Sequence, residues 1–138
     1  MKIDEIKNGI VIDHIEPGKS MEIYNFLNLS ELDCQIAIIQ KASSKKMGKK
    51  DIIKIDGELD IDVNVLGYFD PDVTIIIIKY GERVEKKHPT LPEKIENIIK
   101  CKNPRCITSV EPDIPQIFKL TERKNRVYRC IYCETKAK

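Results

Sequence analysis

Four cysteines near the C-terminus constrain the fold of this chain more than any other feature of its sequence. They form two pairs, Cys101-x4-Cys106 and Cys130-x2-Cys133, with 23 residues between the pairs. Zinc prefers four soft ligands in a tetrahedron, and two short-spaced pairs on separate turns supply that arrangement. The last 38 residues bury too little apolar surface to fold alone, so a bound metal would supply the missing folding free energy. The pattern predicts one structural Zn²⁺ per chain.

Other interpretations of these cysteines are weaker. No apolar block follows the N-terminal Met-Lys, so a secretory signal is not expected and thiolate–metal bonding is favoured over disulfides. An iron–sulfur cluster usually has different cysteine spacings, and four free buried thiols are the remaining alternative. A catalytic zinc is not expected, because four thiolates leave no open coordination position. The fifth cysteine, Cys34, stands alone in an apolar stretch and is expected to be an inert core residue.

Composition and charge divide the chain at about the same place. With 41% hydrophobic and 33% charged residues among 138, collagen-like, low-complexity and wholly disordered classes are excluded. No window approaches the roughly 18 apolar residues of a membrane span, so a cytoplasmic chain without a membrane partner is expected. Residues 1–99 carry a net charge of −4, whereas residues 100–138 carry +6. With prolines at positions 89 and 92 forming a linker, we expect two units, residues 1–92 and 93–138.

Hydrophobic periodicity predicts the elements of the first unit. We expect strands at residues 9–15, 34–40, 51–56, 73–80 and 82–87, helices at residues 19–29 and 60–69, and a polar turn at residues 41–50. Ser20 is the expected helix N-cap. The order β-α-β-β-α-β with an extra edge strand is the ferredoxin-like pattern. The expected fold is therefore α+β, followed by a small all-β unit with strands near residues 116–120 and 126–131.

Basic residues of the first unit have two interpretations. Lys54 lies inside a predicted strand between two isoleucines, so its ammonium stands on the sheet face opposite to theirs. Lys86 is similarly placed on the edge strand, and Asp13 and His14 end the first strand. Lysines from separate strands could hold a polyphosphate as point charges. Composition alone favours solvated surface lysines, and a single His beside an Asp is more often structural than catalytic.

Several strings, taken together, resemble the regulatory chain of aspartate carbamoyltransferase over about residues 3–134. These are Gly-Ile-Val-Ile-Asp-His-Ile at 9–15, Met-Gly-Lys-Lys-Asp-Ile-Ile-Lys-Ile at 47–55, His-Pro-Thr-Leu-Pro-Glu-Lys-Ile-Glu-Asn at 88–97, and the two cysteine pairs. The resemblance implies an N-terminal allosteric domain for nucleoside triphosphates (CTP, UTP, ATP) and a C-terminal zinc domain that docks on the catalytic chain. It also implies a regulatory-chain homodimer and no catalytic activity of the chain itself.

The resemblance also implies which residues bind the effector. Its pattern places Asp13, His14, Lys54 and Lys86 in the effector site with Lys50 nearby, and Ile6 and Ile78 against the base. Two positions depart from the family: Ile76 stands where a polar Asn is common, and Gly81 replaces a larger residue. Both lie where the base would be read, so the base preference is not carried over.

Two other classes of function compete with this interpretation. The basic C-terminal unit would suit a nucleic-acid-binding zinc-ribbon protein, and co-purification with nucleic acid and a steep salt dependence would identify it. An enzyme acting on nucleotides is disfavoured, because no paired carboxylates lie near a nucleophile and the metal site is closed. A regulatory subunit that binds no nucleic acid is the preferred prediction.

Overall fold

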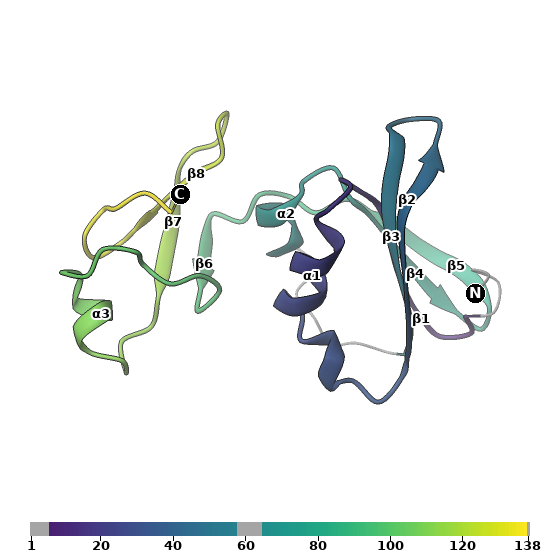
Figure 1. Ribbon diagram of the computed structural model, residues 1–138, viewed down its shortest axis with the longest axis horizontal. Coiled ribbons are helices and arrows are strands. Elements are labelled where there is room, and N and C mark those ends of the chain that lie inside the picture. Colours follow the sequence, from purple (N-terminus) through teal and green to yellow (C-terminus); the bar gives the residue numbers. More distant parts are fainter. Residues whose placement is uncertain (1–5, 58–64, 138) are drawn as a thin grey trace. The chain divides into compact units, whose positions relative to one another are not determined.

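The computed structural model describes residues 6–57 and 65–137, and the chain divides into two compact units, residues 1–90 and 91–138 (Figure 1). The first unit is built on a five-stranded antiparallel sheet with the strand order β2-β3-β1-β4-β5. Its strands are β1 (Gly9–Ile15), β2 (Gln35–Ser44), β3 (Gly48–Asp56), β4 (Thr74–Lys79) and β5 (Glu82–Lys87). This order is the ferredoxin-like one with β5 added at the edge, so the predicted fold class is confirmed.

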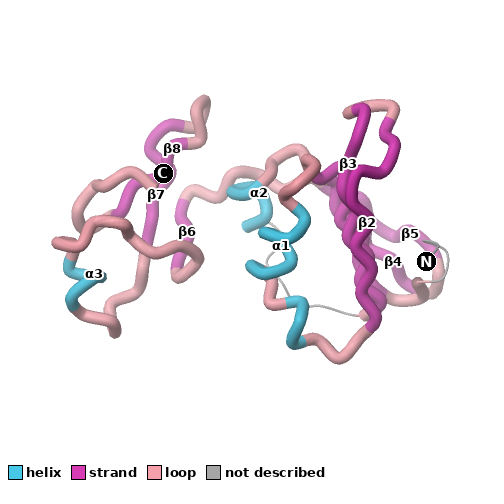
Figure 2. Tube along the Cα trace, in the orientation of Figure 1, coloured by secondary structure: helices cyan, strands magenta, loops and turns pink. Residues whose placement is uncertain are grey.

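Helices cover one face of this sheet (Figure 2). They are α1 (Ser20–Phe26), the short 3-10 helix η2 (Leu29–Glu31) and α2 (Leu66–Phe69). Strand residues two apart share a face, and the alternate isoleucines of β1, β3 and β4 bury themselves against helix residues such as Ile23 and Leu66. Part of the helix expected at residues 60–69 falls outside the described residues.

Two local predictions were wrong. Lys19, not Ser20, precedes the first turn of α1, and it makes no side-chain capping bond. The stretch expected as a polar turn at residues 41–50 instead continues both strands, with residues 45–47 as the turn. Its side chains are mostly exposed or half-buried on both faces, so they lack the apolar alternation that marks a strand with one buried face.

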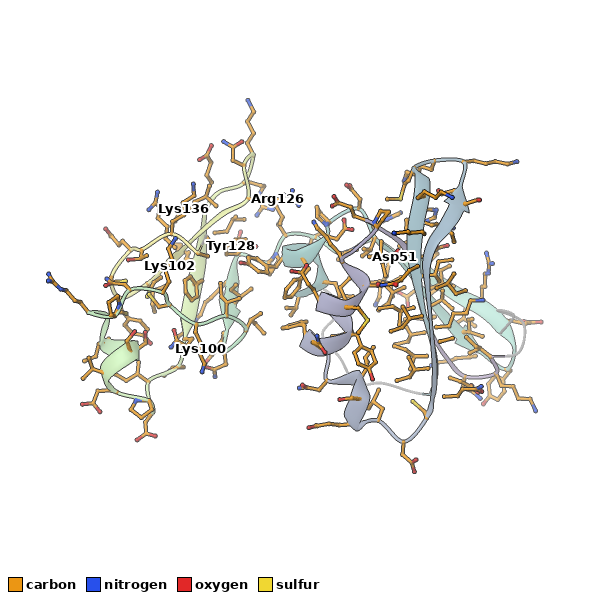
Figure 3. The ribbon with its side chains drawn as sticks, in the orientation of Figure 1. Asp51, Lys100, Lys102, Arg126, Tyr128 and Lys136 are labelled. Atoms are coloured by element: carbon orange, nitrogen blue, oxygen red, sulfur yellow. The ribbon has the colours of Figure 1, made fainter. Side chains whose placement is uncertain are left out.

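The buried carboxylate of Asp51 explains why Ser20 is not a cap. Oδ2 accepts hydrogen bonds from Ser20 Oγ at 2.6 Å and from the Gly18 amide at 3.0 Å, and Oδ1 accepts one from the Lys41 amide at 2.9 Å. Asp51 is fully buried and lies where β3, β2 and the start of α1 meet (Figure 3). It therefore ties α1 to the β2–β3 hairpin at the irregularity in β2 between Ile39 and Ala42.

The second unit has a three-stranded antiparallel sheet in the order β6-β7-β8. Its elements are β6 (Lys94–Glu96), the one-turn helix α3 (Ile107–Val110), β7 (Ile117–Glu122) and β8 (Val127–Cys130). Phe118 and Tyr128 are its large fully buried side chains, and the Tyr128 hydroxyl donates to the Pro92 carbonyl. Within the described residues of the whole chain, no helix is long and apolar enough to cross a membrane.

Candidate functional site

The four cysteines of the second unit come together in one cluster. Their Sγ atoms all lie within 4.8 Å of one another. Cys101 and Cys133 are 3.5 Å apart at sulfur, and Cys106 and Cys130 are 3.6 Å apart. A disulfide would need about 2.05 Å, so these are separate thiols, each paired with a partner from the other half of the motif.

This geometry suits a tetrahedral zinc. With Zn–S bonds of about 2.3 Å, the edges of a sulfur tetrahedron are about 3.8 Å long, close to the separations of 3.5 and 3.6 Å. Four sulfur donors are the closed set that structural zinc prefers, with no position left for water or substrate. The four sulfur donors and the distances between them therefore fit the zinc ion that the cysteine pattern of the sequence predicts.

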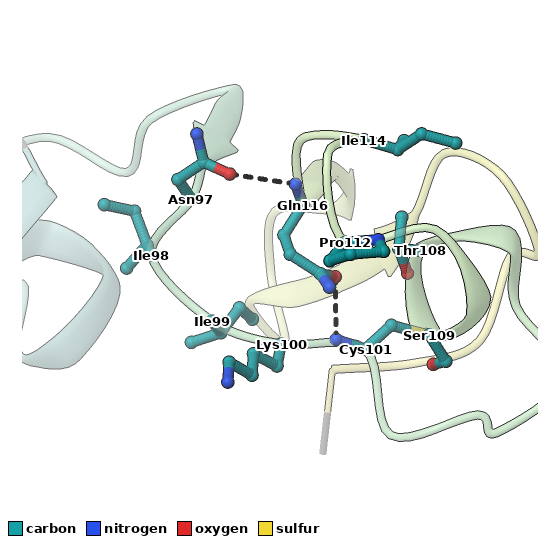
Figure 4. A pocket seen from close by; sticks show the side chains of 10 residues that line it. All are labelled: Asn97, Ile98, Ile99, Lys100, Cys101, Thr108, Ser109, Pro112, Ile114 and Gln116. Carbon is teal, nitrogen blue, oxygen red and sulfur yellow. Dashed lines mark hydrogen bonds between the residues drawn. The ribbon is translucent and has the colours of Figure 1, made fainter.

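Backbone hydrogen bonds hold the first cysteine in place (Figure 4). The side-chain carbonyl of Gln116 accepts a hydrogen bond from the Cys101 backbone amide at 2.9 Å. The backbone amide of Gln116 donates to Asn97 Oδ1 at 3.0 Å. Both residues line a pocket of about 560 Å³ beside the cluster. The sequence interpretation did not identify this brace.

Two threonine hydroxyls contact the sulfurs directly. Thr108 Oγ1 donates to Cys106 Sγ at 3.1 Å, and the Cys133 thiol donates to Thr135 Oγ1 at 3.1 Å. In the metal-free chain, burial raises the pKa of Cys101 to about 12, whereas the hydrogen bond with Thr135 lowers the pKa of Cys133 to about 6.

In the first unit, a row of residues crosses four strands on the sheet face opposite the helices. Val11 of β1 is paired with Lys54 of β3 on one side and with Ile76 of β4 on the other, and Ile76 is paired with Lys86 of β5. Paired residues of antiparallel strands project to the same face. Two lysines therefore flank two apolar residues, with their Cα atoms about 14 Å apart at three strand spacings.

The centre of this face is apolar. Ile6, Val11, Ile76 and Ile78 form a buried cluster with Ile52 packed against it, so the two predicted base-contacting residues lie together. Gly9 allows the Ile6 side chain and the backbone of β3 to lie close to β1. A Cβ at position 9 would lie 2.0 Å from the Ile55 carbonyl oxygen and 2.9 Å from Ile6 Cγ2.

Asp13, His14 and Lys50 form a polar group at the end of β1. Lys50 Nζ lies 2.9 Å from Asp13 Oδ1, and Asp13 also accepts from the His14 amide at 2.7 Å. His14 has a left-handed backbone with φ 58°, and its Nδ1 lies 3.1 Å from Thr74 Oγ1, a partner that the sequence interpretation missed. Burial lowers the pKa of His14, Asp13 opposes this, and the charges of Lys50, Lys46 and Lys86 lower it further.

The two departures from the family pattern have clear positions. Ile76 is 4% exposed at the centre of the row, so its aliphatic side chain stands between the two lysines. Gly81 has φ 78° and follows Tyr80 with φ 54°, which is the two-residue β4–β5 turn that favours glycine. Glycine at position 81 is thus explained by the turn.

Comparisons with known proteins match both units. Residues 1–90 match the model of the aspartate carbamoyltransferase regulatory chain, allosteric domain, and residues 93–138 match that of its metal binding domain. The aspartate carbamoyltransferase regulatory chain of Clostridium botulinum is 52% identical over 134 residues, which cover 97% of this chain and 92% of that protein. The chains of the same name from Clostridium tetani and Bifidobacterium longum are 49% and 44% identical, covering 97% and 100% of this chain and 94% and 99% of those proteins.

Proposed function

The chain belongs to the family of aspartate carbamoyltransferase regulatory chains, and we propose that it binds nucleoside triphosphates on the helix-free face of its first unit and joins the catalytic chain through its second. It is a regulatory chain and not itself the catalyst. The observation that carries the proposal is the row Lys54–Val11–Ile76–Lys86, because it sets two cations on either side of an apolar strip.

The residues of this face divide into two roles. Lysines neutralise phosphates as point charges, and two strands supply such charges: β3 carries Lys50 and Lys54, and β5 carries Lys86. Ile6 and Ile78 offer the apolar surface for a base. Asp13 and His14 provide hydrogen-bonding groups at the end of β1. Because Ile76 has no polar group, we expect backbone groups to read the base edge.

In the second unit, Cys101, Cys106, Cys130 and Cys133 would hold one zinc ion as a structural ligand set. Bound zinc supplies folding free energy here and no chemistry. Reduced thiols as ligands suit a reducing compartment, which supports a cytoplasmic location.

Exposed apolar side chains of the second unit support its docking role. Ile107, Val110 and Ile131 are 44%, 64% and 47% exposed; the first two follow Cys106, and Ile131 lies between Cys130 and Cys133. Such side chains are normal singly, but three in a unit this small supply apolar contacts for a partner. A regulatory-chain homodimer is supported by β2, which lies at a sheet edge where unpaired backbone groups can pair with a second copy.

Calorimetric titration with CTP, UTP and ATP tests the nucleotide site. Lys54→Ala and Lys86→Ala should each weaken binding by about 1–3 kcal/mol, the cost of a lost charge-assisted contact. Lys45→Ala, in the β2–β3 turn, is the matched control and should change little. Equal losses in all three variants would show that the site is wrongly placed.

Co-purification with the catalytic chain tests docking. Val110→Asp should prevent co-purification without loss of bound zinc, whereas Met21→Asp on α1, which replaces another exposed apolar side chain, should not. Capture of the catalytic chain by the Val110→Asp variant at wild-type strength would show that these apolar side chains do not form the docking surface.

In the assembly, a nucleotide that alters catalysis by shifting an equilibrium between two states must bind more tightly to one of them. The state that binds the nucleotide more tightly is therefore also favoured by it, so the binding effects are reciprocal.

A further inference from the structure

The two halves of the cysteine motif share a feature that the metal site alone does not require. In each half, a threonine follows the second cysteine at a distance of two residues: Thr108 after Cys106 and Thr135 after Cys133. Both hydroxyl oxygens lie 3.1 Å from the sulfur of that cysteine. The same offset and the same distance thus recur in two segments with different pair spacings.

Burial makes the two contacts unequal. Thr108 is 5% exposed and is the second residue of α3. Cys106 is the residue that precedes the first turn of that helix. Thr135 is half-buried, in the segment where the Thr135 carbonyl accepts from the Cys130 amide at 3.0 Å. Water can replace a lost hydroxyl more readily at Thr135 than at Thr108, so Thr108 carries the larger effect.

A zinc ion with four thiolates has a net charge of −2, and hydrogen-bond donors aimed at the sulfurs stabilise that charge. Groups that hydrogen-bond to metal ligands tune metal affinity and ligand basicity. We propose that Thr108 and Thr135 are positioning residues that donate hydrogen bonds to the Cys106 and Cys133 thiolates and slow the loss of zinc. At Thr135 the hydrogen bond reverses its direction, because the Cys133 thiol donates in the metal-free chain and a thiolate can only accept. This inference rests on the proposed assignment of the four cysteines as zinc ligands.

The test uses the full chain loaded with Co²⁺ in place of zinc, together with the rate at which the zinc form gives up its metal to a chromogenic chelator. Thr108→Val keeps the side-chain shape and removes the hydroxyl, whereas Thr108→Ser keeps the hydroxyl. Thr121→Val is the matched control, because the Thr121 hydroxyl donates to the Val127 carbonyl at 3.2 Å and touches no sulfur. Thr135→Val tests the second contact, and it keeps the proposal testable should Thr108→Val fail to fold.

The expected results separate a hydrogen bond from mere packing. Thr108→Val should lose zinc about 10- to 100-fold faster than the wild type, and its sulfur-to-cobalt charge-transfer band should move to lower energy, since the sulfur becomes a stronger donor. Thr135→Val should change the rate of zinc loss and the energy of the band in the same direction, but by less. Thr108→Ser should keep the wild-type rate and band, because it keeps the hydroxyl. Thr121→Val should leave the rate and the band unchanged.

Two results would overturn the inference. A charge-transfer band and a zinc-loss rate identical to wild type in both valine variants would show that the hydroxyls do not act on the sulfurs, while leaving the ligand assignment intact. A wild-type cobalt form without the spectrum of four thiolates would instead refute the ligand assignment, and the inference with it.

Discussion

Replacing Asp51 with asparagine should destabilise the first unit strongly. The carboxylate is fully buried and accepts three hydrogen bonds, from Ser20 Oγ, the Gly18 amide and the Lys41 amide. Asparagine has one acceptor oxygen. If that oxygen keeps the bonds of Oδ2, its amide group faces the Lys41 N–H, and two donors oppose each other.

The magnitude follows from this geometry. A buried donor left without an acceptor costs about 1–3 kcal/mol. The bonds from Ser20 Oγ and the Gly18 amide remain, but their acceptor is now neutral. Hydrogen bonds to a charged group are roughly twice as strong as neutral ones, so both bonds become weaker. We expect Asp51→Asn to lower the free energy of unfolding by about 2–4 kcal/mol at pH 7.

The pH dependence supplies a second, independent signature. Burial alone would raise the pKa of Asp51, but the hydrogen bonds from Ser20, Lys41 and Gly18 outweigh it and hold the pKa below its ordinary value. The stabilisation from a depressed carboxyl pKa is complete above the pKa of the unfolded chain, about 4, and is lost as the pH falls through the folded value. The difference in the free energy of unfolding between wild type and Asp51→Asn should therefore shrink below about pH 4.

Urea unfolding followed by circular dichroism at pH 7 and pH 3 measures both quantities. Asp72→Asn, at an exposed aspartate of the same unit, is the control and should stay within about 0.5 kcal/mol of wild type. An Asp51→Asn variant within that range, or a gap of equal size at both pH values, would refute the reasoning.

Three further predictions concern other parts of the chain. Because burial and lysine charges lower the pKa of His14 and a bound polyphosphate would raise it, nucleotide affinity measured by calorimetry should increase as the pH falls below about 7. His14→Asn, whose side chain tolerates the left-handed backbone, should weaken that dependence, and an unchanged pH profile would contradict the assignment. Gly9→Ala should lower unfolding stability by about 1–3 kcal/mol in denaturant titrations, since its Cβ would meet the Ile55 carbonyl oxygen at 2.0 Å; wild-type stability would contradict the close approach. Removal of zinc by a chelator should increase amide hydrogen exchange in β7 and β8 but not in β1 and β3, and equal loss of protection in both units would contradict their separate stabilities.

The sequence predicts strands from runs of β-branched and apolar residues between turn signals. The predicted strand at residues 9–15 has the bounds of β1, which is mostly buried, because β-branched residues and a period of two in polarity near its end mark a strand. The β2–β3 hairpin was predicted too short, since its outer residues have no buried face to impose that period. β6 and α3 were missed, because elements of three and four residues are shorter than any periodic signal.

The sites divide in the same way. Cysteine spacing predicted the four-sulfur cluster because ligands close in sequence share a turn, and Lys54 stood out because its neighbours are isoleucines. The contacts of Thr74, Gln116 and Asp51 involve partners from 10 to 60 residues away. Residue type alone does not indicate such contacts. The repeated Cys-x-Thr was the one local signal available for the sulfur contacts.

The position of β1 also governs the order in which the first unit can fold. β1 comes first in the chain, yet it lies between β3 and β4, while β2 with β3 and β4 with β5 are hairpins of neighbouring strands. Each hairpin closes a short loop, but pairing Gly9 with Ile78 closes a loop of most of the unit, which carries a larger entropic cost. A nascent chain can therefore form the first hairpin early, but it can pair β1 fully with β4 only after residue 79 has been synthesised. Until then the edges of β1 stay open to pairing with other chains.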